Sequence, residues 1–454
     1  MLPELLDVLR CPATGVRLAL DVLEREGDDV RYGVLRAEGE EYPVLAGIPV
    51  LLRGHDDAVR LLWSGRLADA AAAALLRQLS PSRLGRLAGV LGAFNGTRRA
   101  GRVVGRLDRR RLGTALATLL DPGSLDPLAL VRLGFEGWGE RNTEAVHYFT
   151  YRFGTPRHLV ALAATETAAP DAGLLLDLGC GVGHLTWGLG QRFGDARTVG
   201  LDLSLFQLWA ARGVAENGRF VCGDATMLPF ASGSFGLVLA SDVLSFVREK
   251  WAVAREAARA LAPHGTLAVV AVKSSLHPHV YAGMPVPPHA WRTLAAPLPA
   301  YLYADDRVLE RYFDGLPLDA QDAGDTATSP TVTLLAGARS AGSHPTHRQW
   351  PAPSPWPHAR GPLGINPLLR PVAEREDSVV FRRRFPSAYF ARDNPPLADL
   401  LPEEVTIPRA AVDGDRLIPH MVADLVASTA VLALPDLYRS GRLPVAGDGV
   451  GTTP

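Results

Sequence analysis

The segment LLLDLGCGVGHL, residues 174–185, determines the fold that this sequence predicts. Its first five residues are apolar except for Asp177, which is typical of a strand buried on both faces. Three glycines follow at alternating positions, Gly179, Gly181 and Gly183. Glycine adopts positive φ angles at little cost and lets a ligand approach the backbone closely. The segment therefore predicts a buried strand, a ligand-binding glycine loop and the start of a helix.

The spacing of the glycines separates the ligands that such a loop can bind. A dinucleotide fingerprint, G-x-G-x-x-G, would place its third glycine at position 184, which is His184 in this chain. A triphosphate-binding loop would require Gly-Lys-Ser or Gly-Lys-Thr, and the segment contains neither. The loop therefore fits neither a nicotinamide dinucleotide nor a nucleoside triphosphate.

Strand-like and helix-like segments alternate after the glycine loop. The strand-like segments are continuous runs of Val, Leu and Ala, as in parallel strands that helices cover on both faces. The pattern predicts an α/β fold with a doubly wound, mostly parallel sheet. The strand-like segments are 197–204, 218–230, 235–247 and 265–272, and the helical ones are 183–193, 205–214 and 250–261.

The chain of 454 residues is longer than one ordinary domain. Short β-like segments separated by Gly and Pro come first, helix-forming sequence follows, and a Pro-rich stretch lies after the α/β region. The last part of the chain is predicted to have mixed secondary structure, with a helix at 419–434. The predicted divisions are a β-rich module at 1–54, a helical segment at 55–163, the α/β domain at 164–342, a linker at 343–364 and a C-terminal extension at 365–454.

Composition limits the classes of partner. The formal net charge is −1, so no overall field attracts nucleic acid or an anionic membrane. The three cysteines are far apart in sequence and predict no disulfide framework. Glu4 and Asp7 interrupt the first apolar stretch, which argues against a signal peptide, and no apolar run reaches the length of a membrane span. We therefore expect a cytoplasmic protein.

Four segments resemble, in order and spacing, the motifs of class I S-adenosylmethionine-dependent methyltransferases. LDLGCGVGHL, residues 176–185, resembles the first motif, and Asp202 ends the second strand as the acidic residue of that family does. GDATMLPF, residues 223–230, and LPFASGSFGLVLASDVL, residues 228–244, resemble the segments around the third and fourth strands. The resemblance covers roughly residues 170–340 and implies a seven-stranded sheet with S-adenosylmethionine as the cofactor.

The same resemblance implies roles for individual residues. Asp202 would accept hydrogen bonds from the ribose hydroxyls, and Asp224 would accept one from the adenine amino group. The helix that follows Gly183 would offer its free N–H groups to the carboxylate of the ligand. Asp177 would either reach the methionyl amine through water or cap the turn. The cofactor-binding residues implied are Asp177, Gly179, Cys180, Gly181, Gly183, Asp202, Leu203, Asp224, Ala225 and Ser241.

The first ~52 residues resemble the Trm112-like, zinc-ribbon-type module found beside or fused to methyltransferases. The resemblance rests on LLDVLRCP, residues 5–12, and YPVLAGIPVLL, residues 42–52. After Cys11 and Pro12, the metal-binding versions place a second cysteine, whereas this chain has alanine and threonine. A structural zinc requires four ligands, so we predict that the module binds no metal.

Methyl transfer from a sulfonium requires alignment of the acceptor and exclusion of water, and it needs a base only when the acceptor must lose a proton. Asp242, His277 and His279 follow the fourth and fifth strands and are the catalytic candidates. The histidines are equally compatible with a surface or packing role, and no third metal ligand lies near them. Tyr148 and Tyr151, on the helix before the loop, are candidates for substrate contact or for packing.

The sequence says least about the acceptor of the methyl group. The added helical and C-terminal segments favour a small-molecule or peptide-like acceptor, as in specialised metabolism, with the C-terminal extension as a cap. Arg382, Arg383 and Arg384 are candidates to bind an acceptor carboxylate there, and the arginine-rich segment 98–111 is either a solvated surface or an anion site. The alternatives are an RNA or protein methyltransferase, suggested by the Trm112-like resemblance, and a non-catalytic protein regulated by S-adenosylmethionine.

Overall fold

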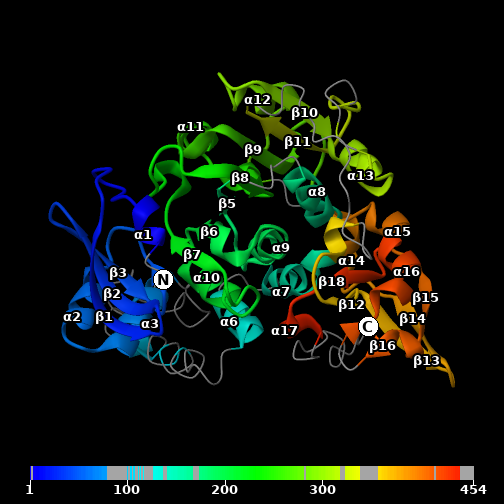
Figure 1. The fold of residues 1–454 in the computed structure, drawn as a ribbon, viewed down its shortest axis with the longest axis horizontal. Helices are drawn as coiled ribbons and strands as arrows, with labels where there is room; N and C mark the ends of the chain where they lie inside the picture. The colour runs from blue at the N-terminus through cyan, green and yellow to red at the C-terminus, as the bar shows by residue number, and fades with distance from the viewer. Residues whose placement is uncertain are drawn as a thin grey trace.

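Strand β5 (Leu174–Leu178), which is the LLLDL run, lies within a seven-stranded sheet of the computed structural model (Figure 1). The other strands are β6 (Thr198–Asp202), β7 (Arg219–Cys222), β8 (Phe235–Ser241), β9 (Leu261–Lys273), β10 (Ala300–Ala304) and β11 (Thr331–Ala336). Their order is β10-β11-β9-β8-β5-β6-β7. Strand β11 pairs antiparallel with both neighbours, and the pairings from β9 to β7 are parallel. The predicted α/β fold with a mostly parallel sheet is therefore confirmed.

The structure describes most of the chain. The described residues are 1, 4–78, 126–135, 141–166, 173–280, 283–316, 318, 323–337, 356–413 and 416–439, with single positions between 100 and 116. The arginine-rich segment 98–111 and the first part of the predicted linker, 343–355, lie largely outside them.

Helices cover both faces of the sheet, because successive side chains of each strand point to opposite sides. Leu175, Leu237 and Leu239 pack in one apolar cluster with residues of α8 (Pro156–Thr165), α9 (His184–Phe193) and α13 (Asp305–Phe313). Leu176 and Val238 pack in another cluster with residues of α11 (Lys250–Ala260) and α12 (Pro288–Thr293). The alternation fixes the register of the strands, since a shift of one residue would exchange the two faces.

The N-terminal module is a four-stranded antiparallel sheet in the order β1-β2-β3-β4, preceded by a short helix. Backbone hydrogen bonds attach it to the edge of the large sheet. Leu51 N donates to Cys222 O of β7 at 2.8 Å, and Arg10 N donates to Pro229 O at 2.9 Å. The elements are α1 (Leu5–Val8), β1 (Ala19–Glu26), β2 (Asp29–Ala37), β3 (Glu40–Leu45) and β4 (Ile48–Pro49).

The elements described between this module and β5 are helices joined by turns, as the sequence predicts. Its first pair of helices packs with β3 and with α10 (Leu205–Ala211), the helix that follows β6. The described helices are α2 (Asp56–Trp63), α3 (Leu67–Gln78), α6 (Pro127–Gly134), α7 (Arg141–Tyr151), the 3₁₀ turn η2 (Arg152–Gly154) and α8.

The C-terminal extension forms small sheets that lie beside α7 and α9 in Figure 1. The helix predicted at 419–434 is much shorter in the structure, where α16 covers only Ala423–Ala427. The backbone turns at Thr429, where φ is +56°, and the following residues pair with another strand instead of continuing a helix. The elements are β12 (Leu363–Ile365), β13 (Leu369–Glu374), β14 (Ser378–Arg383), α14 (Ala388–Asp393), α15 (Leu397–Leu400), β15 (Glu404–Pro408), β16 (Val412–Asp413), β17 (Arg416–Leu417), α16 (Ala423–Ala427), β18 (Val431–Ala433) and α17 (Asp436–Arg439), with 3₁₀ turns at 357–359, 409–411 and 419–421.

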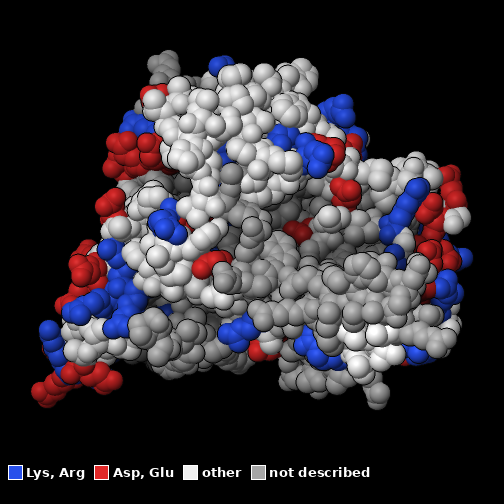
Figure 2. All heavy atoms as spheres, turned by 180° about the vertical axis from the view of Figure 1, so that it is seen from behind, with Lys and Arg blue, Asp and Glu red and all other residues white. Residues whose placement is uncertain are grey.

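Charges of both signs occur on the surface. On the face shown in Figure 2, the basic and acidic side chains of the described residues lie mainly along the margins and are interspersed. This distribution agrees with the near-zero net charge of the chain. Within the described residues, the helices are too short or too polar to span a lipid bilayer.

Candidate active site

The glycine loop has the backbone geometry that the sequence predicts. Gly179, Gly181 and Gly183 have φ angles of +72°, +54° and +81°, in the region that disfavours residues with a Cβ. A Cβ at Gly179 would lie 2.5 Å from a methyl carbon of Val243, on the loop after β8. The loop is therefore held tightly against the carboxyl ends of β5 and β8.

Asp202 stands at the carboxyl end of β6 and closes one side of the loop. Its Oδ2 accepts a hydrogen bond from Gly181 N at 2.9 Å, and its Oδ1 accepts one from Ser204 N at 2.8 Å. Burial raises the pKa of this carboxyl, although the backbone N–H donors oppose the shift. Each carboxylate oxygen has more than one lone-pair site, so both can accept a further hydroxyl group.

The loops after β6 and β7 combine a carboxylate with exposed apolar side chains. Asp224 Oδ1 accepts hydrogen bonds from Thr226 N and Thr226 Oγ1, both at 2.8 Å, which leaves Oδ2 for another donor. Leu203 is 58% exposed and Met227 is 48% exposed. Two exposed apolar side chains beside a carboxylate suit a flat ring that carries an amino group. Ala225 follows Asp224 at the start of the turn η4 (Ala225–Met227).

Asp177 lies inside β5, beneath the loop, and is 2% exposed. Thr186 Oγ1, on the first turn of α9, donates to Asp177 Oδ2 at 2.7 Å. Burial raises the pKa of Asp177 to about 7, and the nearby Asp202 adds to the shift. Burial also raises the pKa of the Cys180 thiol well above its usual range, so this thiol is not an activated nucleophile.

The carboxyl end of β8 carries a second acidic residue with unusual geometry. Asp242 has a φ of +58°, which is rare for a residue other than glycine. Its Oδ2 lies 3.7 Å from Arg152 Nη1 and 3.6 Å from Arg157 Nη1. Its Oδ1 is buried and has no hydrogen-bond partner in the structure. Ser241, one residue earlier, lies with its Oγ 3.4 Å from Arg152 Nη2.

The two predicted substrate tyrosines lie in different surroundings. Tyr148 is 42% exposed, its ring meets that of His184 edge-on, and the Arg152 guanidinium lies 5.0 Å from its centroid. Tyr148 is therefore beside the glycine loop and accessible. Tyr151 is buried, its Oη accepts a hydrogen bond from Arg370 Nη2 at 3.1 Å, and it packs against the C-terminal extension. Tyr151 therefore has the contacts of a packing residue.

His277 and His279 lie on the loop after β9, the strand beside β8. His279 Nε2 is 2.8 Å from Ser274 O, and burial lowers the pKa of this imidazole. The neutral ring can therefore donate to the carbonyl. Among the described residues, no three His, Cys, Asp or Glu side chains are grouped as metal ligands would be.

Two residues that the sequence analysis missed fix the loops of this site. Gln78, at the end of α3, donates from Nε2 to Leu203 O at 3.1 Å and accepts from Leu205 N through Oε1. Tyr438, on α17, lies with its Oη 2.9 Å from His184 Nε2 at the start of α9. Gln78 and Leu203 are 125 residues apart in sequence, and His184 and Tyr438 are 254 residues apart. No local sequence pattern therefore indicates either contact.

Two of the three arginines proposed to bind an acceptor carboxylate are used within the C-terminal extension. Arg382 donates to Glu404 Oε2 at 2.8 Å across two strands. Arg383 donates to the carbonyl oxygens of Ala398 and Leu401. Since these bonds hold β14 to its neighbours, the hypothesis of an arginine cluster at the active-site mouth is not supported by these two side chains.

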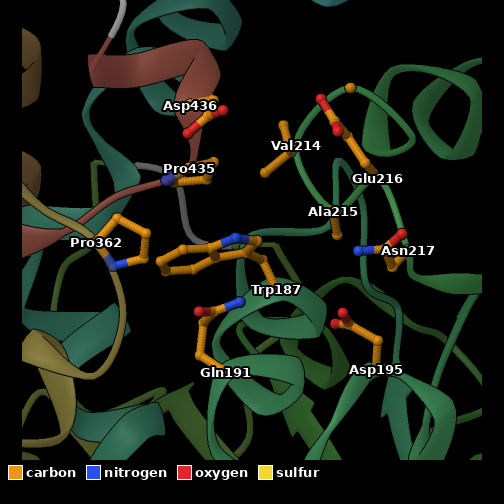
Figure 3. Close-up of a pocket in the computed structure, with 11 residues that line it drawn as sticks. Trp187, Gln191, Asp195, Val214, Ala215, Glu216, Asn217, Pro362, Pro435 and Asp436 are labelled. Carbon is orange, nitrogen blue, oxygen red and sulfur yellow. The ribbon is translucent and has the colours of Figure 1, made fainter. Parts of the chain in front are cut away.

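A small hollow of about 130 Å³ lies at the amino-terminal edge of the sheet, opposite to the edge that carries the glycine loop. Trp187 and Gln191 of α9 line it together with Pro362 and Pro435 of the C-terminal extension (Figure 3). Its remaining lining residues include Asp195, just before β6, and Asn217, just before β7. Parallel strands share their amino-terminal edge, so this hollow is separate from the glycine loop.

Comparisons with known proteins agree with the geometry of the glycine loop. Residues 176–269 match a family model described as a methyltransferase domain. The chain is 31% identical over 164 residues to the demethylmenaquinone methyltransferase of Roseiflexus sp. (strain RS-1), covering 33% of this chain and 66% of that protein. It is 33% identical over 156 residues to methyltransferase GfsG of Streptomyces halstedii, covering 33% and 47%. The chain thus spans less than two thirds of these relatives.

One further relative and one solved structure are also similar to this chain. A malonyl-[acyl-carrier protein] O-methyltransferase of Legionella pneumophila is 36% identical over 96 residues, covering 20% of this chain and 34% of that protein. A complex between the Haloferax volcanii Trm112 methyltransferase activator and a putative methyltransferase matches with 22% identity and a TM-score of 0.33, covering 45% of this chain and 97% of that chain.

Proposed function

We propose that this chain, which carries an S-adenosylmethionine-dependent methyltransferase domain, transfers a methyl group to a small-molecule or peptide-like acceptor. The observation that carries the proposal is that Asp202 and the glycine loop lie at one edge of the sheet together with Asp242. In an open α/β sheet, ligands bind outside the carboxyl ends of the strands where the strand order reverses. Strand β5 lies at this switch point, between β6 and β8.

The described residues fit the cofactor at each part of the molecule. Asp202 would accept the ribose hydroxyls, and Asp224 with the Ala225 N–H would bind the adenine edge between Leu203 and Met227. The three glycines let the loop backbone pack closely against Val243 and α10, and the N-terminus of α9 would face the ligand carboxylate. We propose as cofactor-binding residues the ten that the sequence analysis named, of which Asp177 is the first and Ser241 the last.

The acceptor side would be formed by Asp242, Tyr148 and the loop after β9. S-adenosylmethionine, when bound, supplies an electrophilic methyl group on its sulfonium. Asp242 has a buried oxygen without a partner, which suits a hydrogen-bond donor on the acceptor. Arg152 and Arg157 would orient this carboxylate, and Tyr148 would exclude water. His277 and His279 are the second candidates for proton transfer.

The substitution Asp242→Asn tests this assignment. It keeps the size of the side chain but removes the charge that would hold or remove the acceptor proton. We expect kcat to fall about tenfold, the cost of one charge-assisted hydrogen bond of roughly 1.5 kcal/mol. The dissociation constant for S-adenosylmethionine, measured by calorimetry, should stay the same. A weakened cofactor affinity with unchanged kcat would place Asp242 at the cofactor instead.

Asp177 should make cofactor binding depend on pH. The pKa of its carboxyl is raised to about 7 in the folded chain. Its contribution to the free energy of unfolding therefore falls as the pH rises from the ordinary pKa of 3.8 toward 7. The cationic sulfonium and ammonium groups of the ligand favour the ionised carboxylate and should lower this pKa on binding.

Binding is therefore expected to release part of a proton near neutral pH and to tighten from about pH 6 to about pH 8. Calorimetry in buffers with different ionisation enthalpies measures this release. S-adenosylhomocysteine, which lacks the sulfonium charge, should release less. Unchanged proton release in Asp177→Asn would assign the effect to another group.

We propose the domain divisions that the sequence indicates. Residues 1–54 would be a Trm112-like module without metal, 55–163 a helical segment, 164–342 the S-adenosylmethionine-binding domain and 365–454 a cap over the acceptor. The cap assignment is supported by Asp393 of α14, which pairs with Arg157 at 2.8 Å and so connects the extension to Asp242. The relatives include a norajmaline N-methyltransferase of Rauvolfia serpentina, 32% identical over 102 residues, which favours a small-molecule acceptor.

The experiment that tests the function has two stages. Calorimetry of the folded chain with S-adenosylmethionine and S-adenosylhomocysteine should show saturable binding of both, and its absence would overturn the proposal. The chain is then incubated with cell extract and methyl-labelled cofactor. Label in solvent-extractable small molecules or short peptides supports the proposal. Label in RNA or protein supports an RNA or protein methyltransferase, and binding without transfer supports a regulatory protein.

A further inference from the structure

A second hollow, of about 400 Å³, lies where the N-terminal module meets the methyltransferase domain. Its walls come from β2 and the β3–β4 turn of the module and from the segment between α10 and β7 of the domain. That segment enters β7 at its amino end, so the hollow is on the edge of the sheet opposite to the glycine loop. The proposed methyl-transfer function does not use it.

Three arginines from different elements line this hollow, namely Arg31 of β2, Arg212 after α10 and Arg219 of β7. Their ion pairs are few. Arg31 Nε lies 3.3 Å from Glu26, whose side chain is 76% exposed, and Arg219 Nη2 lies 3.9 Å from Glu4, whose side chain is 68% exposed. Ion pairs to such exposed carboxylates contribute little.

Arg212 forms no ion pair within 4 Å among the described residues, although Asp29 and Glu26 attract it from farther away. Its guanidinium carbon lies over the Trp209 ring, 5.8 Å from the centroid. The Nε of Arg219 is buried and has no hydrogen-bond partner. A buried N–H donor without an acceptor is costly, and a bound ion is one explanation for such a group in a native structure.

The electrostatics show that the cations are close together. Burial and the neighbouring Arg31 lower the pKa of Arg212 to about 10. Burial lowers the pKa of the Met1 amino group, and Arg31 and Arg212 both add to that shift. Each cation therefore raises the electrostatic cost of the others.

The acidic residues near the hollow neutralise this cluster only in part. Asp29 lies 3.1 Å from the Met1 amino group, and Asp29 and Glu26 both oppose the lowering of the Arg212 pKa. Asp195 and Glu216 also line the hollow of Figure 3, so they lie toward the junction of the two hollows. The lining thus has three arginines and the Met1 amino group against three carboxylates, a small excess of positive charge.

We propose that this hollow is a binding site for a phosphate-type oxyanion, with Arg212 as its central ligand and Arg31 and Arg219 beside it. Guanidinium groups bind phosphate oxygens through paired N–H donors, and three of them around one anion would satisfy the orphaned donors. The oxyanion is either free phosphate or the phosphoryl group of a small phosphorylated molecule. Its binding would join the N-terminal module to the domain, because the ligands come from both.

Calorimetry of the full chain with inorganic phosphate and with glycerol 3-phosphate tests the site, with sodium chloride matching the ionic strength. We expect saturable binding to one site, and the tighter of the two ligands identifies the source of the oxyanion. The melting temperature should rise with the same ligand, since a ligand that binds only the folded state stabilises it. Absence of saturable binding for both ligands would overturn the proposal.

Arg212→Gln should weaken this binding at least tenfold, and Arg31→Gln, on the module side, should weaken it as well. The second variant keeps the test valid if the first does not fold. Arg382→Gln is the matched control, because it removes an exposed arginine paired with Glu404 on a distant sheet. Equal affinity in Arg212→Gln, Arg31→Gln and the control would show that the anion binds elsewhere.

Discussion

Replacing Asp202 by alanine is expected to weaken S-adenosylmethionine binding roughly a hundredfold. The carboxylate would accept hydrogen bonds from both ribose hydroxyls, and bonds to a charged group contribute about 1.5 kcal/mol or more each. The loss of two such bonds is about 3 kcal/mol, and each 1.4 kcal/mol is about tenfold in affinity. Calorimetry with S-adenosylmethionine and S-adenosylhomocysteine measures the change for both ligands.

The fold should tolerate this substitution. Burial raises the pKa of Asp202, so the ionised side chain is disfavoured in the folded chain and its removal relieves that cost. The N–H groups of Gly181 and Ser204 lose an acceptor, which water can replace at the half-buried loop. Asp202→Asn, which keeps one acceptor oxygen, should bind with intermediate affinity. Wild-type affinity in Asp202→Ala would remove the ribose assignment.

Gly179→Ala is expected to abolish measurable cofactor binding and to lower stability. The new methyl group would meet Val243 at 2.5 Å, and the residue would have to keep a φ of +72°. Relief of this clash requires the glycine loop to move away from the end of β8. The movement would displace Gly181, whose N–H is fixed by Asp202. Thermal melting and calorimetry measure the two effects.

Two further variants separate the causes. Gly233 has almost the same φ, +71°, but a Cβ there would have no heavy atom within 4 Å. Gly233→Ala therefore isolates the cost of the positive φ, about 1 kcal/mol, without a clash. The double variant Gly179→Ala with Val243→Ala should recover part of the binding. If Gly179→Ala behaves like Gly233→Ala, close packing against Val243 is not what shapes the loop.

The sequence was informative where the structure depends on short-range patterns. The apolar run before Gly179 predicts β5, and the repeated strand and helix patterns predict the sheet, because both periodicities are local. The positive φ angles of the loop follow from the glycines themselves. Asp202 and Asp242 could be placed at one edge because they follow strands of a parallel sheet.

The sequence failed where distant segments meet. Gln78 and Tyr438 reach the site through tertiary packing, and neither residue type is distinctive at its position. The segment 419–434 contains apolar residues at helical spacing, yet Val431–Ala433 pairs with β12 as β18. Pairing with a neighbouring strand outweighed helix propensity there. Arg383 was read as a ligand for an acceptor, but its position beside two backbone carbonyl groups makes it a structural donor.

The hydrogen bond from Leu51 to Cys222 has a consequence for expression of the methyltransferase domain alone. Strand β7 is the last strand of the large sheet, and the module lies along its outer side. Removal of the module would expose unpaired N–H and C=O groups and apolar residues such as Val221 and Phe230. An unprotected strand edge is a template for association with other chains. A fragment that begins after residue 54 should therefore self-associate, so the module shields the domain from aggregation.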